Sequence, residues 1–286
     1  MQEAMSKAAA LIEALPYMQS FRDKIVVVKM GGSVLASEHE HSVGIDITFL
    51  EHVGMRPVVV HGGGPQISEM MKQRGKKPQF IRGMRVTDAE TVGIAWEALC
   101  VTNQEIVSAI VAAGGSALGL TGKDRLPLRA RKMVMKGAED VDFGYVGEVE
   151  HVAIGIIVRE CIADRIPVLL PLAIGSDGGL YNVNADAAAG AVAAALGAEK
   201  LVVLSDTPGV KVSESEDNYA ASLTASEART LVQRGVIKGG MEPKVEACIT
   251  ALMGGVRKTH IIDGRMKHSL LLEIYTDKGI GTEIVP

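Results

Sequence analysis

The stretch PVVVHGGGP, residues 57–65, joins a run of β-branched residues to three consecutive glycines and a proline. The valines predict a buried strand, and Pro65 suits the first turn of a helix that the sequence predicts over residues 65–74. The glycines between them permit a tight turn, and they also let a ligand approach bare backbone N–H groups. The stretch therefore predicts a strand–turn–helix unit whose turn either only redirects the chain or holds an anion.

The same alternation of short β-branched runs and longer helical patterns recurs along the chain. Further strands are predicted over residues 24–29, 117–120, 168–171, 200–204 and 259–263. Further helices are predicted over residues 88–113, 153–164, 185–196, 224–234 and 244–253. Alternation of this kind predicts an α/β protein with parallel strands and helices on both faces of the sheet.

Local signals refine this outline. Thr87 and Thr224 each stand three residues before a glutamate, which predicts a capping box at each position. Residues 125–150 lack a helical pattern and predict an inserted hairpin region over one edge of the sheet, and residues 176–183 predict a hairpin turn that feeds a strand. A first helix over residues 7–18 carries an apolar face that packs either on its own subunit or on a neighbour.

Composition excludes several classes of protein. The chain has 286 residues, a net charge of −4 and only 3% aromatic residues, so neither a basic field nor stacking platforms point to nucleic acid. Its three cysteines form no CxxC pair, which disfavours a disulfide framework or a zinc site and fits a reducing compartment. The N-terminus lacks the pattern of a signal peptide, and no apolar run reaches membrane-span length. We expect a cytoplasmic protein without nucleic-acid or membrane partners.

Three glycine-rich stretches fall at the carboxyl ends of predicted strands, where parallel α/β sheets bind ligands. They are KMGGSV (29–34), VHGGGP (60–65) and LSDTPGV (204–210). Each alone is explained by a turn, whereas the three together favour one polyanion-binding crevice. Neither GxxxxGK[ST] nor GxGxxG is present, so any nucleotide is bound by another design.

Charged and amide side chains accompany these glycines. Lys29 ends a buried strand, where its ammonium either reaches water or faces the crevice. Lys244 lies in the first turn of a predicted helix, where its charge opposes the helix dipole and suggests an anionic partner. The run NVNAD (182–186) contains more polar groups than one helix cap needs. His61 has no nucleophile beside it, and we expect a structural role at the strand end.

Taken in order, eight blocks make the chain resemble the amino acid kinase family from about residue 24 to the C-terminus. The blocks are KMGGSV, PVVVHGGGPQI, GMRVTD, GYVGEV, YNVNADAAAG, ALGAEKLVVLSDTPGV, IKGGMEPKVEA and HIIDGR. Within the family, the combination of HGGGPxI, GxRVTD and NxNAD resembles the members that act on N-acetyl-L-glutamate. Met30 and Ser33 depart slightly from the usual pattern, at positions that matter through their backbone.

The resemblance implies a three-layer αβα sandwich with a central, mostly parallel sheet. It implies ATP-dependent phosphorylation of the side-chain carboxylate of N-acetyl-L-glutamate, the second step of arginine biosynthesis. It divides the chain into an N-terminal oligomerisation helix (1–22) and a kinase domain (23–286). In that domain, a lobe over about 23–180 would bind acetylglutamate and a lobe over about 181–286 would bind ATP.

The resemblance also assigns residues to roles. Lys29 and Lys244 would contact the transferring phosphoryl group. Asp186 would hydrogen-bond both lysines and hold them in place. The acetylglutamate would be bound by Gly63, Gly64, Arg85 and Asn182. ATP would be bound by Gly32, Ser205, Asp206, Gly240 and Met241. Mg²⁺ would be held mainly by the nucleotide phosphates, with no metal site on the protein.

The N-terminal helix and the C-terminal run HSLLLEIYTDKGIGT (268–282) resemble arginine-inhibited members of the family. In those members the helix joins dimers into a hexameric ring, a trimer of dimers. By that resemblance, an arginine site would be lined by Tyr17, Lys211, Glu273 and Gly279. Arginine is thus an expected effector and a homo-oligomer the expected assembly, while binding of a PII-type regulator stays open.

Two alternatives share these residues. A kinase acting on acetylaminoadipate, or on aminoadipate carried by a small protein, would differ by one methylene in the substrate, which gives little discrimination. A non-catalytic regulator could keep the fold and bind only arginine or a nucleotide. A pure binder, however, has no use for Lys29, Lys244 and Asp186 together.

Overall fold

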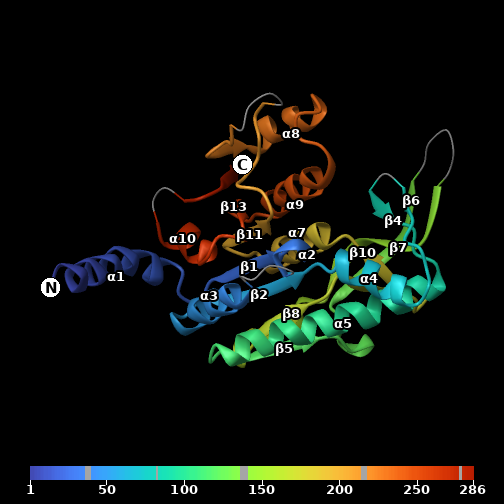
Figure 1. The fold of residues 1–286 in the computed structure, drawn as a ribbon, viewed down its shortest axis with the longest axis horizontal. Helices are drawn as coiled ribbons and strands as arrows, with labels where there is room; N and C mark the ends of the chain where they lie inside the picture. The colour runs from blue at the N-terminus through green and yellow to red at the C-terminus, as the bar shows by residue number, and fades with distance from the viewer. Residues whose placement is uncertain (36–39, 82, 136–140, 214–217, 277–278) are drawn as a thin grey trace.

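The computed structural model describes residues 1–35, 40–81, 83–135, 141–213, 218–276 and 279–286 (Figure 1). Its helices are α1 (Gln2–Ser20), α2 (Gly32–Leu35), α3 (Glu40–His52), α4 (Gly64–Gln73), α5 (Ala89–Ala112), α6 (Ile154–Ile162), α7 (Ala185–Leu196), α8 (Ala225–Gln233), α9 (Glu242–Met253) and α10 (Ser269–Tyr275). The described residues also form the 3₁₀ turns η1 (Lys123–Arg125) and η2 (Gly239–Met241), the second of which directly precedes α9. Among these described helices, none combines the length and apolarity that a membrane span requires.

Among the described residues, eight strands form the central sheet in the order β12-β14-β13-β11-β1-β2-β8-β5. In chain order these are β1 (Ile25–Met30), β2 (Arg56–His61), β5 (Ala117–Leu120), β8 (Ile166–Leu169), β11 (Lys200–Ser205), β12 (Ser222–Thr224), β13 (Lys258–Asp263) and β14 (Thr282–Val285). Neighbouring strands are parallel except for the antiparallel pair β13 and β14. The predicted α/β class with a mostly parallel sheet is confirmed, and every strand predicted for this sheet is present.

A small closed barrel accompanies the sheet. It contains β6 (Leu128–Met135), β7 (Val141–Val152), β9 (Leu172–Gly175) and β10 (Leu180–Val183). The antiparallel pairs β6–β7 and β9–β10 are the hairpins that the sequence predicts near residues 125–150 and 176–183. The loop 136–140 between β6 and β7 lies outside the described residues. A third hairpin pairs β3 (Phe80–Ile81) with β4 (Met84–Arg85).

The helices form two layers on opposite faces of the sheet, because alternate strand residues point to opposite faces. Val27 of β1 belongs to a core that includes residues of α6, α7, α8 and α9. Its neighbours Val26 and Val28 belong to a second core with residues of α3, α5 and α10, against which the end of α1 packs. The expected three-layer αβα sandwich is therefore confirmed.

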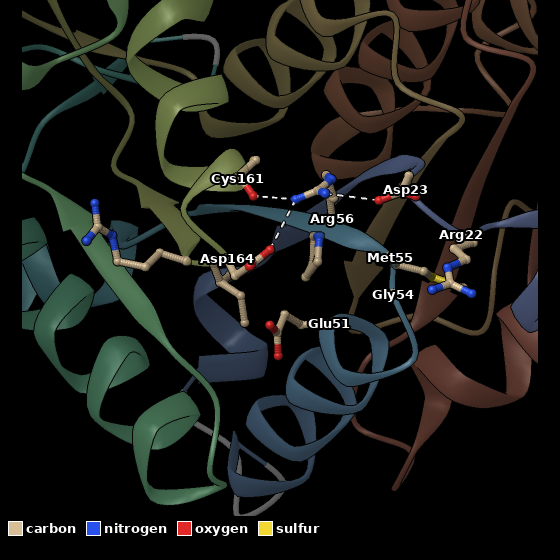
Figure 2. A pocket seen from close by; sticks show the side chains of 11 residues that line it. Arg22, Asp23, Glu51, Gly54, Met55, Arg56, Cys161 and Asp164 are labelled. Carbon is tan, nitrogen blue, oxygen red and sulfur yellow. Dashed lines mark hydrogen bonds and ion pairs between the residues drawn. The ribbon is translucent and has the colours of Figure 1, made fainter.

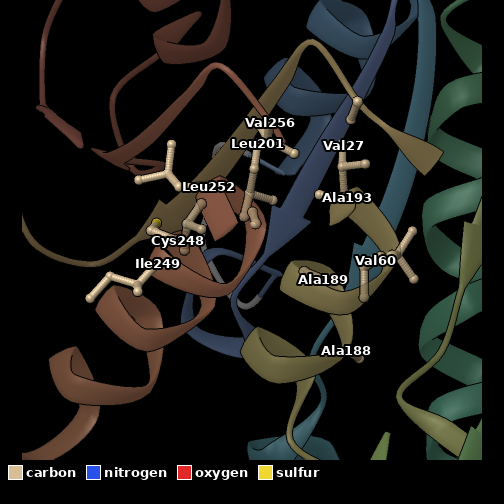
Figure 3. Close-up of a cluster of buried hydrophobic side chains, with 14 of the residues drawn as sticks. Val27, Val60, Ala188, Ala189, Ala193, Leu201, Cys248, Ile249, Leu252 and Val256 are labelled. Carbon is tan, nitrogen blue, oxygen red and sulfur yellow. The ribbon is translucent and has the colours of Figure 1, made fainter. Parts of the chain in front are cut away.

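Small residues on α7 allow close packing between the sheet and α9. Figure 3 shows Ala188, Ala189 and Ala193 beside Val27 and Val60, next to apolar side chains of α9. These three alanines are fully buried, so each adds van der Waals contact without loss of side-chain entropy. This packing fixes the start of α7 against the carboxyl ends of β1 and β2.

One local prediction is wrong. The capping box at Thr224 is present, since its hydroxyl accepts the Glu227 N–H while the Glu227 carboxylate accepts the Thr224 N–H. At α5, however, the cap is Asp88, whose carboxylate accepts the Thr91 N–H at 2.8 Å. Thr87 is buried, its hydroxyl donates to the Arg85 carbonyl and its N–H donates to the Phe143 carbonyl. Its groups therefore serve strand-like pairing with β7 rather than the helix end.

Candidate active site

A crevice of about 280 Å³ opens at the carboxyl ends of β1 and β2. Its lining includes residues of the loops after both strands, of β4, of β10 and of the first turn of α7. Seven of the residues that the sequence singles out lie on its wall: Lys29, Gly32, Gly63, Gly64, Arg85, Asn182 and Asp186. Chain segments far apart in sequence thus converge where the parallel strands end.

Lys29 and Asp186 form a buried ion pair in this crevice. Lys29 alternates with the valines of β1 and lies on the same face as Val27, toward the start of α7. The Lys29 Nζ lies 2.8 Å from the Asp186 Oδ1, and the two residues are 4% and 7% exposed. An ammonium and a carboxylate at this distance form an ion pair. Asn184 caps α7 by accepting the N–H groups of Asp186 and Ala187, which fixes the carboxylate at the helix start.

Lys244 brings a second ammonium toward the pair. Burial is the largest influence on Lys244 and lowers its pKa, while the charges of Asp186 and Asp206 raise it and that of Lys29 lowers it. Its Nζ donates to the Gly240 carbonyl at 2.8 Å, across the step from η2 into α9. The crevice and its border therefore hold two cations close enough to interact through space, which suits an anionic ligand.

The remaining residues expected on the nucleotide side lie beside the crevice rather than in its lining. Ser205 ends β11, is buried, and its hydroxyl lies 3.4 Å from the Asp206 carboxylate. Gly240 and Met241 form the 3₁₀ turn before α9, and Met241 packs against the core on the α7 face. All four are thus near Lys244 or at the carboxyl end of the neighbouring strand.

The glycine run lies between β2 and α4. Gly63 is the residue before α4, and Gly64 and Pro65 begin the helix, so backbone N–H groups of the first turn face the crevice without an intrahelical acceptor. A side chain at Gly63 would collide with Leu99 of α5. Close packing against α5 therefore accounts for the glycine there, in addition to any ligand contact.

Arg85 is held on the wall of the crevice by several contacts. Its guanidinium donates to the Gly64 carbonyl at 2.9 Å and to the Ser68 hydroxyl at 2.7 Å. The same group lies over the Phe80 ring, 4.8 Å from the centroid. Burial lowers the pKa of Arg85, yet a guanidinium stays charged at neutral pH. Sequence reasoning missed Ser68 and Phe80, because nothing in their local pattern marks them as neighbours of Arg85.

A second cavity, of about 550 Å³, lies between the end of α1, the start of β11, and α10. It is lined by three of the four residues expected to bind arginine: Tyr17, Glu273 and Gly279. The fourth, Lys211, is not among its lining residues and lies against the Tyr219 ring. Lys200 lines the cavity instead, and burial lowers its pKa.

Buried charges meet in this second cavity. The His260 Nδ1 lies 2.5 Å from the Glu273 Oε1, and both residues are buried. Burial opposes ionisation of Glu273, but His260, the Ile280 N–H and Lys200 hold the pKa of this carboxyl below its ordinary value. The other ring nitrogen of His260 is buried and has no hydrogen-bond partner among the described residues. The cavity thus presents a carboxylate, an ammonium and an imidazole to a ligand.

A third cavity, of about 160 Å³, lies at the opposite, amino ends of β1, β2 and β8 (Figure 2). Its central side chain, Arg56, is already paired: it lies 2.9 Å from the Asp23 carboxylate and 3.4 Å from that of Asp164, and it donates to the Cys161 carbonyl. The charge of Arg56 is thus matched within the protein, and none of the site residues that the sequence singles out lines this cavity. The part of the chain that is described contains no cluster of three or more His, Cys, Asp or Glu side chains that could hold a metal ion.

Comparison with known proteins matches this geometry to one family. The model of the amino acid kinase family matches residues 24–263. An acetylglutamate kinase of Symbiobacterium thermophilum is 46% identical over 290 residues, which cover 99% of this chain and 99% of that protein.

Two crystal structures of the N-acetylglutamate synthase of Neisseria gonorrhoeae are also similar. The complex with coenzyme A and N-acetyl-glutamate has a TM-score of 0.85 at 28% identity and covers 98% of this chain. The complex with coenzyme A and L-arginine has a TM-score of 0.83 at 27% identity and covers 97%. This chain spans 63% and 65% of the length of the synthase in these two structures. By the family match over most of its length, the chain belongs to the amino acid kinase family.

Proposed function

We propose that this protein transfers the γ-phosphoryl group of ATP to the side-chain carboxylate of N-acetyl-L-glutamate. A carboxylate oxygen forms a bond to the γ-phosphorus, the bond from that phosphorus to the β,γ-bridging oxygen breaks, and ADP and N-acetylglutamyl 5-phosphate result. The observation that carries the proposal is the buried Lys29–Asp186 pair beside the Gly63–Gly64 turn. The near full-length similarity to an acetylglutamate kinase supports the choice of substrate.

The reaction needs no general base in the protein. A glutamate side chain has a pKa of about 4.3 and is ionised at neutral pH, so the nucleophile is ready. The obstacle is repulsion between a carboxylate and a phosphate, which positive charge and fixed dipoles reduce. Lys29 and Lys244 supply that charge, and Asp186 holds the Lys29 ammonium at the end of β1.

The substrate side is formed by the glycine turn and Arg85. In this proposal the N–H groups of Gly63 and Gly64 bind the carboxylate that is phosphorylated. Arg85 binds the α-carboxylate with two parallel hydrogen bonds, and Asn182 completes that wall. The rigid contacts of Arg85 with Ser68 and Phe80 keep the guanidinium oriented before substrate arrives.

The nucleotide lies on the other side of Lys29 in this proposal. The ammonium groups of Lys29 and Lys244 lie near one carboxylate, that of Asp186, and this excess of positive charge fits a polyanion. Burial lowers the pKa of Lys244 despite the charges of Asp186 and Asp206, which also favours an anionic ligand. Gly32, Ser205, Asp206, Gly240 and Met241 would contact ATP. Mg²⁺, held mainly by the nucleotide phosphates, would neutralise charge on the transferring group. Residues about 23–180 then form the acetylglutamate lobe and 181–286 the ATP lobe of a cytoplasmic enzyme.

We further propose that arginine inhibits the enzyme through the second cavity. Glu273 suits a guanidinium or an ammonium group, and Lys200 suits a carboxylate. The related synthase has been crystallised with L-arginine, which supports this choice of ligand. On α1, Leu11 and Ile12 are 63% and 69% exposed, so a second copy of the chain would cover an apolar face of this helix. A hexamer built from dimers is the assembly that we propose.

One assay separates the possible functions. ADP release is measured with N-acetylglutamate, N-acetylaminoadipate or glutamate as acceptor, each with and without arginine. The proposal requires turnover with N-acetylglutamate at least tenfold above that with either alternative. Preference for N-acetylaminoadipate would reassign the substrate, and absence of turnover with all three would leave a binding protein that uses the same fold.

A further inference from the structure

His61, which the proposed mechanism does not use, lies fully buried directly before the glycine turn. It ends β2, where alternate residues point to opposite faces. Val58 and Val60 belong to the core on the α7 face, while Val59 belongs to the core on the α5 face. His61 shares the side of Val59, so its imidazole extends under α5, away from the Lys29–Asp186 pair.

The hydrogen bonds of the ring define its tautomer. The His61 Nδ1 lies 2.7 Å from the Gly62 carbonyl oxygen, which can only accept, so Nδ1 carries the proton. The Nε2 lies 3.1 Å from the Asn103 Nδ2, which donates to it. Burial lowers the pKa of His61 to about 4, so the ring is neutral at physiological pH and keeps one donor and one acceptor.

Asn103 anchors the other end of this chain of hydrogen bonds. It is 1% exposed on α5, and its Nδ2 also donates to the Val168 carbonyl of β8 at 3.0 Å. A side chain at Gly119 of β5 would overlap the Asn103 Oδ1, so the bare strand there makes room for the amide. One side chain thus fixes His61 to α5 and to β8, neither of which belongs to the glycine turn.

This chain of hydrogen bonds orients the peptide between Gly62 and Gly63, because His61 holds the Gly62 carbonyl. On either side, the Gly62 N–H donates to the Met30 carbonyl at 2.8 Å, and the Gly63 carbonyl accepts the Ile67 N–H at 2.9 Å. Between these two bonds, glycine leaves the peptide plane free to rotate. In a trans peptide the C=O and the following N–H point in opposite directions, so a carbonyl held toward His61 directs the Gly63 N–H away from α5.

We infer that His61 is a positioning residue that holds the Gly62 carbonyl so that the Gly63 N–H points into the crevice, with Asn103 locking its tautomer. The inference rests on the proposed function, because it assumes that this N–H binds the substrate carboxylate. Preorganised backbone donors are effective because they need no reorientation when charge arrives.

Steady-state kinetics of three variants test the inference. His61→Phe keeps the ring and removes the bond to Gly62, and the KM for N-acetylglutamate should rise about tenfold or more while the KM for ATP changes less than about twofold. His61→Asn places an amide donor near the position of Nδ1, and it should recover most of that loss. Thr102→Val is the matched control: Thr102 is buried on α5 next to Asn103, its hydroxyl donates to the Ala98 carbonyl, and both KM values should stay at the wild-type level.

Imidazole ¹⁵N NMR gives a readout that does not depend on activity. Wild-type protein should show His61 with Nδ1 protonated and Nε2 unprotonated at pH 7, and Asn103→Leu should shift the Nε2 resonance, because Nε2 then loses its hydrogen-bond donor. Should His61→Phe fail to fold, Asn103→Leu serves as the kinetic variant, with a selective rise in the KM for N-acetylglutamate.

An Nε2-protonated ring in the wild type would overturn the inference. An unchanged KM for N-acetylglutamate in His61→Phe, or an equal rise in both KM values, would overturn it as well. Wild-type protein without N-acetylglutamate-dependent turnover would instead refute the proposed function, and the tautomer would then report on the hydrogen-bond chain alone.

Discussion

Removing the charge of Asp186 should destabilise the protein far more than removing a surface charge at the same distance from its lysine. The Lys29–Asp186 and Lys132–Asp142 pairs are both separated by 2.8 Å, but the first is buried and the second is exposed. At this distance, an effective dielectric constant of about 20 gives ~6 kcal/mol of attraction. Loss of one partner of a buried pair typically costs about 3–5 kcal/mol, because the other charge stays buried.

Asp186→Asn should therefore lower the free energy of unfolding by about 3 kcal/mol, the low end of that range, since the Asn carbonyl still faces the ammonium. Asp142→Asn, the matched control, should cost less than about 1 kcal/mol. The double variant Lys29→Met/Asp186→Asn should recover at least about 1 kcal/mol of the loss, because neither charge is then buried alone.

Urea unfolding at fixed protein concentration and low ionic strength, without substrates, measures all of these values. Equal losses for Asp186→Asn and Asp142→Asn would refute the reasoning, as would a double variant no more stable than Asp186→Asn. ADP release should fall by at least about a hundredfold in Asp186→Asn, whatever the stability of the variant.

Further predictions concern Lys244, Glu273 and the two threonines at predicted helix caps. Because burial lowers the pKa of Lys244, activity should fall as the pH rises through a value below 10.5, and Lys244→Arg should move that loss to higher pH. Between the lowered pKa of Lys244 in the folded protein and its ordinary value of 10.5, the unfolded chain binds more protons than the folded one. The free energy of unfolding should therefore rise with pH in this range, as the partly buried ammonium loses its charge. Lys244→Met should abolish that rise in urea unfolding measured at several pH values. Glu273→Gln should keep its turnover but need at least about tenfold more arginine for half-inhibition, and unaltered inhibition would exclude the second cavity as the site. Thr224→Ala should lower the free energy of unfolding by about 1 kcal/mol without change in KM, whereas Thr87→Ala should leave the start of α5 capped by Asp88, as amide hydrogen exchange can check.

Most of the sheet could be predicted from sequence because its strands are buried on both faces and read as continuous β-branched runs. Helix α3 could not, since Gly44 and several β-branched residues in EHSVGIDITFLEH lower the intrinsic helix propensity. Its stability comes from tertiary packing of Ile47 and Leu50 on the sheet, which a single segment does not reveal. The wrong prediction of a Thr87 cap at α5 has a related cause. Thr87 fits the local spacing of a capping box, but its hydroxyl donates to the Arg85 carbonyl and its N–H donates to the Phe143 carbonyl of β7.

The crevice followed from sequence more readily than the second cavity. Lys29 and the glycine run can be recognised from sequence because they lie at the carboxyl ends of predicted strands, where parallel sheets bind ligands. Lys200 begins a strand and His260 lies within one, and both patterns are ordinary for exposed or structural residues. Only the pairing of β11 with β13, together with the packing of α1 and α10 over their amino ends, turns these two side chains toward one cavity.

The place of β14 in the sheet sets an order of assembly during synthesis. β14 lies between β12 and β13 and is the only described strand that pairs with β12. Residues 225–285 therefore have to be translated before β12 can join the sheet, which takes roughly 3–12 s at about 5–20 residues per second. Strands β1, β2, β5 and β8 can pair well before that time. The free edge of β13 thus stays open, available to chaperones or to a wrong strand, until residue 285 has left the ribosome.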